Sequence, residues 1–251
     1  MINELIFLLH CLTVSLLAAV ALKYGQLALA SLACLYAILA NLFVFKQVLL
    51  LTLCVTCTDA YSVGSGIVLN LTQEYFGSKV ARKILYLALA ALLIFVILAQ
   101  IQLYYLPAPS DFSQTAYLNI LGQTPRILGA SIFSFAISQN LDRVLYSYFN
   151  RKFAHKFFIL RNYSSLLISQ LVDTGLFTIL GLAGTFTNLW DIFVFSYLIK
   201  IITIIISVPV VSFCKKYLPV TSLDFTRDER EKNNLQKEKN NLQKKPGTGK
   251  D

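Results

Sequence analysis

A polar pattern ending in a carboxylate occurs twice within long apolar stretches of this 251-residue chain. The first copy reads Ser134-x-x-x-Ser138-Gln139-x-x-Asp142, and the second reads Ser165-x-x-x-Ser169-Gln170-x-x-Asp173. An acid near the centre of a membrane-spanning helix costs about 2.5–3.5 kcal/mol on insertion scales, so such acids usually serve a ligand, an ion or a charged partner. Because both copies carry the same hydroxyl and amide neighbours, we interpret them as a binding site or path for a small polar solute.

The polar residues recur at helical spacing, since positions four apart share one face of an α-helix. One stripe holds Ser134, Ser138 and Asp142, and the other holds Ser165, Ser169 and Asp173. Asn70 and Glu74 repeat the spacing of a polar residue four positions before an acid. Arg126, Arg161 and Asn162 open their helices. Lys200, inside the last apolar segment, could neutralise a buried acid, which is the favoured role, or contact the solute.

The spacing also predicts relative depth in the membrane, at about 1.5 Å of rise per residue. Gln139 and Gln170 are expected at similar depth, where they could face each other. Asp173 is expected near the midplane, with Asp142 and Glu74 closer to the cytoplasm. A carboxylate beside an amide suits a solute with adjacent N–H donors and a carbonyl, such as the edge of a guanine-like base, although other polar solutes fit as well.

Serine and amide side chains also join membrane helices to one another, through hydrogen bonds worth about 0.6 kcal/mol on average. For any single serine of the two stripes this structural role is the favoured interpretation. For Asp142, Asp173 and Glu74 a ligand or charged partner is favoured, because a buried acid needs compensation.

The composition indicates an all-α, polytopic membrane protein. Hydrophobic residues make up 56% of the chain and the mean hydropathy is +0.63, while each crossing needs roughly 20 apolar residues. The apolar runs are continuous rather than alternating, which excludes an outer-membrane barrel. We expect a bundle of about six or seven spanning helices, in the segments at about 3–22, 26–45, 47–76, 83–106, 126–148, 162–183 and 190–214.

Residues 1–220 are expected to form the transport domain, and residues 221–251 a hydrophilic, disordered tail. The third segment is too long for one plain helix, and Gly64-Ser65-Gly66 within it indicates either a break that lines a cavity or a kink. Residues 107–125, which contain Pro107 and Pro109, are expected to form an outward loop.

The net charge of +9 reports topology rather than binding to nucleic acid. Basic residues gather in the connections near 79–83 and 151–161 and after the last helix, whereas the connections near 107–125 and 184–190 carry none. This alternation follows the positive-inside rule. It predicts a cytoplasmic C-terminus and, with seven helices, an outside N-terminus; if the first two segments form a re-entrant pair, the N-terminus is inside. We expect the protein in the bacterial cytoplasmic (inner) membrane.

Nothing in the chain indicates a cofactor or a metal. Cys54-x-x-Cys57 has the spacing of a zinc or redox motif, but it lacks a second pair and a nearby histidine. The chain also has no P-loop for nucleotide hydrolysis.

Several blocks, in order, resemble the queuosine precursor transporter family, also called the vitamin uptake transporter family. They are Asn70-Leu-Thr-Gln-Glu-Tyr-Phe-Gly77 with Ala81-Arg82-Lys83, Pro125-Arg126 through Ser138-Gln139-x-x-Asp142, Arg161-Asn162 through Ser169-Gln170-x-x-Asp173-Thr174, and Lys200 with Pro209. The resemblance spans roughly residues 59–209. It implies import of a 7-deazaguanine (the cyano base, the aminomethyl base or queuine) for tRNA modification. Asn70 stands where the resemblance leads us to expect an aspartate.

Three alternatives accompany this interpretation. The chain could be the substrate-binding subunit of an energised uptake complex for another small solute, with partner subunits or a homo-oligomer. It could be an intramembrane enzyme whose Asp142 and Asp173 act as a carboxylate pair, which is less favoured because the expected offset is about 9 Å along the membrane normal. A structural or assembly factor would leave the buried acids unexplained.

Overall fold

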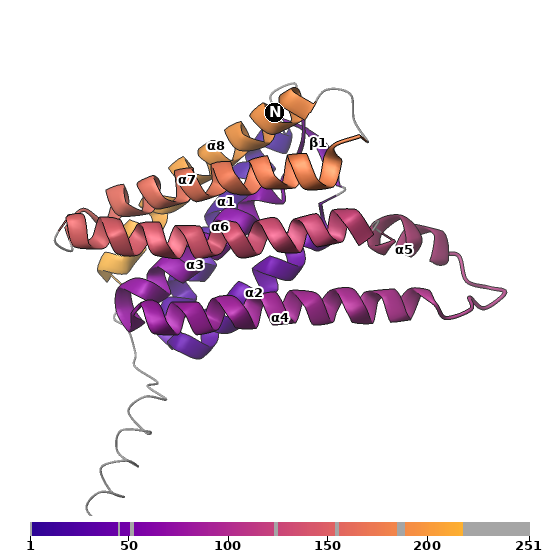
Figure 1. Cartoon of the computed structure of the whole chain (residues 1–251), viewed down its shortest axis with the longest axis horizontal. Coiled ribbons are helices and arrows are strands. Elements are labelled where there is room, and N and C mark those ends of the chain that lie inside the picture. Colours follow the sequence, from indigo (N-terminus) through magenta and orange to yellow (C-terminus); the bar gives the residue numbers. More distant parts are fainter. Residues whose placement is uncertain are drawn as a thin grey trace, which may run out of the picture.

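The computed structural model describes residues 2–44, 46–50, 53–122, 125–153, 156–184 and 189–217. These residues form a helical bundle with one short hairpin (Figure 1). In chain order the elements are α1 (Ile2–Tyr24), α2 (Gln26–Leu42), β1 (Gln47–Leu50), β2 (Leu53–Thr56), α3 (Asp59–Phe76), α4 (Ser78–Leu103), α5 (Gln114–Leu121), α6 (Pro125–Lys152), α7 (Phe158–Phe177), the π-helical segment η1 (Thr178–Leu182) and α8 (Leu189–Tyr217).

Each of the seven expected apolar segments contains one long helix, so the all-α membrane bundle is confirmed. Among the described residues, α1, α4, α7 with η1, and α8 are long and apolar enough to cross a membrane, and α5 with α6 passes as a bent pair. α2 falls short by its length of 17 residues, and α3 carries several polar residues. The predicted tail lies outside the described residues.

The third segment differs from the expectation of a broken or kinked helix. Its first part is an antiparallel hairpin, in which Gln47 pairs with Thr56 and Leu50 with Leu53. Its second part, α3, runs without interruption through Gly64-Ser65-Gly66. A short apolar run rich in Val, Leu and Thr is compatible with a strand as well as a helix, which is why hydropathy alone merged the two elements.

The glycines of α3 allow neighbouring helices to pack closely against it. A Cβ at Gly64 would lie 2.4 Å from a methyl of Val14 on α1, and one at Gly66 would lie 2.6 Å from a methyl of Leu166 on α7. The prediction of a cavity-lining break is therefore wrong. Small residues let helix backbones approach each other in membrane bundles.

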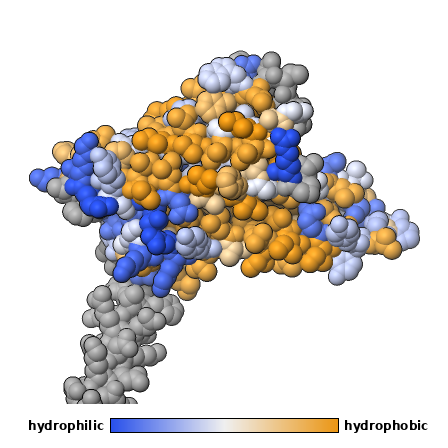
Figure 2. Space-filling view, viewed as in Figure 1, coloured by the Kyte–Doolittle hydropathy of each residue, from blue (hydrophilic) through white to orange (hydrophobic). Residues whose placement is uncertain are grey.

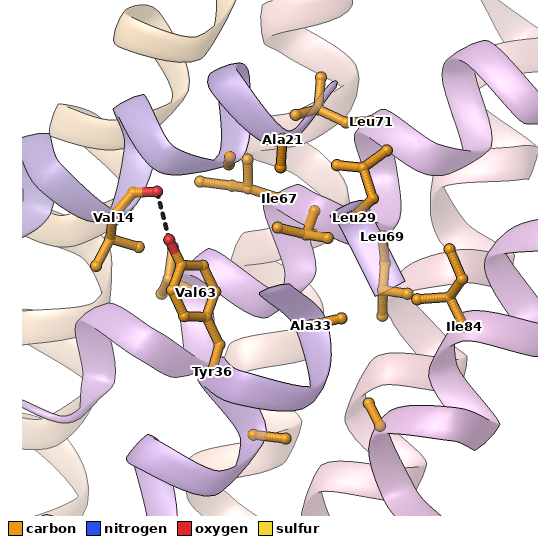
Figure 3. Packing of buried hydrophobic residues seen from close by; sticks show 14 of the residues in the cluster. Val14, Ala21, Leu29, Ala33, Tyr36, Val63, Ile67, Leu69, Leu71 and Ile84 are labelled. Carbon is orange, nitrogen blue, oxygen red and sulfur yellow. Dashed lines mark hydrogen bonds between the residues drawn. The ribbon is translucent and has the colours of Figure 1, made fainter. Parts of the chain in front are cut away.

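α3 is the central helix of the bundle, with every residue from Val63 to Gln73 buried. Its apolar side chains pack with α1, α2 and α4 in one cluster (Figure 3). Within this cluster the Tyr36 hydroxyl donates a 2.7 Å hydrogen bond to the Val14 carbonyl. Burial of this kind places the polar side chains of α3 in the interior.

One end of the bundle carries the basic connections. The α3–α4 turn is made at Gly77, whose φ of 88° lies in the region that glycine favours. It lies near the α6–α7 connection, since Arg161 near the start of α7 donates both to Glu74 near the end of α3 and to Asn150 near the end of α6. Figure 2 shows hydrophilic side chains at this end and an apolar band across the middle of the face in view. On α4, Leu87, Ile94 and Leu98 are all at least half exposed, as expected of a helix in contact with lipid.

Candidate functional site

A cavity of about 540 Å³ opens between the ends of the helices farthest from the basic connections. Its wall is formed by the end of α2, the hairpin, the start of α3, the start of α6, the end of α7 with η1, and the start of α8. Its volume falls in the range of small-molecule binding sites. Its polar and aromatic lining includes Asn41, Asp59, Ser62, Ser131, Ser134, Phe135, Asp173, Phe177, Asp191, Phe195, Ser196 and Lys200.

A buried ion group forms one wall of this cavity. The Lys200 ammonium lies 2.5 Å from Asp173 Oδ2 and 3.8 Å from Asp59 Oδ1. Lys200 is only 4% exposed. Lys200 thus lies within ion-pair distance of two acids, and the group carries one more carboxylate than ammonium when all three are ionised. Such a wall can accept hydrogen bonds from the N–H groups of a solute.

The two copies of the repeated pattern face each other across α6 and α7. Ser138 of α6 donates a 2.9 Å hydrogen bond to Asp173 of α7. In return, Ser169 of α7 donates to Asp142 of α6 at 3.4 Å. Each acid is therefore held by the serine that belongs to the other copy.

This antiparallel register offsets Asp142 from Asp173 by four residues, or roughly 6 Å along the helix axes. No hydrogen bond joins the two carboxylates among the described residues. An aspartic dyad needs two acids close enough to share a proton. The observed partners instead give each acid its own environment, one ionic and one neutral.

A layer of buried polar atoms lies deeper than the cavity, around Gly66 of α3. Asp142 Oδ2 and Gln139 Oε1 lie 3.6 and 3.7 Å from the position that a Cβ of Gly66 would occupy. Neither atom has a hydrogen-bond partner among the described residues, and the same holds for Asn70 Oδ1 and Gln170 Nε2. Buried polar atoms are rarely left unpaired in proteins, so this layer has the character of a site for a ligand.

A second ion group lies at the opposite end, next to the basic connections. Arg161 of α7 donates two 2.9 Å hydrogen bonds to the two carboxylate oxygens of Glu74. Tyr146 donates to Glu74 at 2.9 Å, and Arg161 also donates to Asn150. Along α3, Glu74 lies roughly 22 Å from Asp59 at the cavity. This bidentate pair joins the ends of α3, α6 and α7.

The predicted site residues occupy three levels along the bundle. Ser134, Asp173 and Lys200 line the cavity. Gln139, Asp142, Asn70, Ser165, Ser169 and Gln170 lie deeper, with Ser62 of the cavity wall donating to Gln170 at 3.1 Å. Glu74 and Arg161 lie at the far end, together with Asn162, whose side-chain amide donates within α7 to the Phe158 carbonyl.

Arg126 lies apart from the other predicted site residues. Its side chain is exposed and donates a 2.9 Å hydrogen bond to the Leu180 carbonyl in η1. It does not belong to the cavity wall. Gln139 and Gln170, expected to face each other, share no hydrogen bond among the described residues.

The sequence analysis missed Asp59, Asn41 and the aromatic residues of the cavity wall, Phe135, Phe177 and Phe195. Asp59 lies where the hairpin gives way to α3, inside a run that read as one apolar segment. The signal that could have identified Asp59 and Asn41 is the one that identified Asp142, namely a polar side chain within an apolar stretch.

Comparison with known proteins gives the family. A family model described as "Putative vitamin uptake transporter" matches residues 62–214. A protein of Bacillus subtilis (strain 168), named "Probable queuosine precursor transporter", is 36% identical over 183 residues, which cover 72% of this chain and 80% of the relative. No solved structure matches the chain. Since the family model covers more than half of the chain and the relative aligns with more than two thirds of it, the protein belongs to the vitamin uptake transporter family of membrane transporters.

Proposed function

We propose that the protein imports a queuosine precursor, a 7-deazaguanine base, through the cavity between α2, α3, α6, α7 and α8. The proposal is supported by the name of the Bacillus subtilis relative. The observation that carries it is the ion group of Lys200, Asp173 and Asp59 on the wall of a cavity of suitable size. The solute must offer donors to a carboxylate of this group, and a guanine-like edge does so with its ring N–H and exocyclic amine.

The remaining walls suit a flat, partly apolar solute. Phe135, Phe177 and Phe195 line the cavity, and aromatic rings bind nucleobases by stacking on their faces. Ser134 is 1% exposed and its hydroxyl has no hydrogen-bond partner among the described residues. We propose that Ser134 and the Asp173 carboxylate together bind the polar edge of the base, while the phenylalanine rings contact its faces.

The orientation of the cavity follows from the charges. The basic connections belong in the cytoplasm by the positive-inside rule, and the cavity lies at the opposite end of the bundle. We propose that the cavity opens to the outside of the cytoplasmic membrane and that the C-terminus is cytoplasmic. Glu74 and Arg161 would then hold α3 and α7 together on the cytoplasmic side, and this pair must separate before the base can be released inward.

Complementation tests this function in cells that can neither make nor import queuosine precursors. The chain is expressed, the cyano base, the aminomethyl base and queuine are supplied separately, and queuosine in tRNA is measured. Restoration by at least one base is expected, and Asp173→Asn should abolish it with the protein still in the membrane. No restoration by any base, with the wild-type protein present in the membrane, would contradict the proposal.

The alternative of a binding subunit within an energised complex differs in one outcome. A subunit of that kind would bind the base but would not move it across a membrane without its partners. Transport by the purified chain in liposomes therefore separates the two.

A further inference from the structure

We propose that Asp142 binds one monovalent cation, a proton or Na⁺, that is carried together with the substrate. The inference rests on the proposed transport function and adds its source of energy. The inference is based on a fully buried carboxylate that has no cationic partner among the described residues, and on the oxygens beside it that lack hydrogen-bond partners.

The immediate neighbours of Asp142 are all neutral. The side chain is 0% exposed, and the groups closest to its carboxylate are the Ser165 and Ser169 hydroxyls of α7 and the Asn70 amide of α3. A carboxylate in such a place carries a penalty of several kcal/mol unless a positive charge compensates it.

The two buried cations on the surrounding elements, Lys200 and Arg161, are already paired with other acids. Lys200 of α8 binds Asp173 and Asp59, and Arg161 of α7 binds Glu74 of α3. Arg143 follows Asp142 in the chain but projects from a different face of α6, where it donates to the neutral Ser78 hydroxyl of α4. The remaining titratable neighbour, Tyr146, donates to Glu74. The positive charge that Asp142 needs must therefore come from solution.

Oxygen atoms suited to a small hard cation converge beside the acid. Asp142 Oδ2 and Gln139 Oε1 approach the same point above Gly66. The Asn70 side chain also contacts Asp142, and its Oδ1 has no hydrogen-bond donor among the described residues. Hard cations prefer carboxylate and amide oxygens. A proton shared between Asp142 and Gln139 would satisfy the same acceptors. Either a proton or Na⁺ therefore supplies the positive charge that Asp142 needs.

The position of Asp142 links the cation to the substrate. Asp142 lies roughly 6 Å deeper than Asp173 along α6 and α7, and the reciprocal serine bonds connect the two acids. A movement of α6 against α7 when the cavity closes on the base would change both sites together. With its cation bound, the Asp142 site is neutral, which lowers the cost of passing between the outward and inward states.

The first test needs no substrate. The thermal midpoint of the purified full chain is measured in NaCl against KCl, at several pH values, for the wild type, Asp142→Asn and the control Asp111→Asn in an exposed loop. If the cation is Na⁺, NaCl raises the wild-type midpoint by mass action. If it is a proton, the wild-type midpoint falls as pH rises, because the folded state keeps a proton that the unfolded chain releases. Asp142→Asn should lose the dependence, and Asp111→Asn should keep it.

A second variant guards against misfolding of Asp142→Asn. Gln139→Leu leaves the acid in place but removes one oxygen. If the cation is Na⁺, the NaCl concentration that gives half of the rise in thermal midpoint should change by threefold or more. If it is a proton, the pH of half effect should change by half a unit or more. Equal dependence on NaCl and pH in the wild type and both site variants would overturn the inference.

The second test uses liposomes with an imposed Na⁺ or pH gradient and the aminomethyl base as probe. Wild-type uptake should rise with one of the two gradients, and Asp142→Asn should lose at least nine tenths of the rise while still binding the base. If no base binds the wild type but the Asp142-dependent midpoint shift persists, the proposed function fails and the cation site stands. If the base binds and no gradient drives uptake, cation coupling is refuted.

Discussion

The Ser138 hydroxyl donates a 2.9 Å hydrogen bond to the Asp173 carboxylate, so the serine of one copy of the repeated pattern holds the acid of the other. Ser169 and Asp142 make the reciprocal contact. The repetition in the sequence thus corresponds to an antiparallel pairing of α6 with α7, which sets the depth of both acids.

Ser138 and Ser134 are predicted to respond differently to alanine. Ser138→Ala should lower the free energy of unfolding by about 1.5–3 kcal/mol, because it removes a hydrogen bond to a charged acceptor. Ser134→Ala, one turn away and equally buried, removes a hydroxyl that has no partner among the described residues, so it should leave stability unchanged and weaken binding of the base. Both are measured by thermal unfolding and by binding in detergent. Equal destabilisation by the two variants would contradict the assigned contacts.

The Lys200–Asp173 pair is predicted to be more harmful to break than to remove. Lys200→Met should destabilise the protein by about 3–5 kcal/mol, because it leaves carboxylates unpaired in the membrane interior. The double variant Lys200→Met with Asp173→Asn should recover part of that loss of stability. It should not transport, since the carboxylate that accepts hydrogen bonds from the base is gone. Thermal midpoints and uptake are read on the same samples. Transport by the double variant would show that Asp173 is not a substrate ligand.

Glu74 and Arg161 provide a double-mutant cycle at the other end of the bundle. Glu74→Gln and Arg161→Gln should each cost about 3–5 kcal/mol, and the double variant should cost less than the two losses added together. If the pair also holds the cytoplasmic side closed, a cysteine at Ser165 should become more reactive to a water-soluble reagent in both single variants. Additive losses would mean that the two side chains do not interact.

Close packing at the glycines of α3 is tested by a matched pair of substitutions. Gly64→Ala should destabilise the bundle by about 1–3 kcal/mol, because the new methyl would meet Val14 and Tyr36. Gly129→Ala, on an exposed part of α6 with nothing within 4 Å, should be neutral or stabilising by about 0.5–1 kcal/mol, since alanine favours helix. The check is the thermal midpoint of each variant; a neutral Gly64→Ala would refute the close contact between α1 and α3.

The charge of the cavity predicts an order of binding affinity among the three bases. Three acids, Asp59, Asp173 and Asp191, line it with the single ammonium of Lys200 among its described lining residues. The aminomethyl base and queuine carry an amine that is protonated at neutral pH, whereas the cyano base does not, so the first two should bind more tightly. Asp191→Asn should reduce the difference without changing affinity for the cyano base. Tighter binding of the cyano base by the wild type would contradict this prediction.

Much of the bundle was predictable because membrane insertion imposes length and hydropathy on each helix. The stripe of Ser134, Ser138 and Asp142 was also predictable, and all three side chains are buried. The hairpin was not, because the few polar residues at its junction with α3, Thr56, Thr58 and Asp59, were merged into one long apolar segment. The pairing of Ser138 with Asp173 was not, because it depends on the register of α6 against α7. That register depends on how the two helices pack against each other, which the pattern within either helix alone does not specify.

The most direct test of the central claim is exchange of a radiolabelled aminomethyl base by the purified chain in liposomes loaded with the unlabelled base. Wild-type protein should accumulate label transiently, as expected of a carrier. Asp173→Asn should not, while Asp111→Asn behaves as wild type. Absence of exchange by correctly inserted wild-type protein, with each of the three bases in turn, would contradict the assignment of the cavity to queuosine precursors.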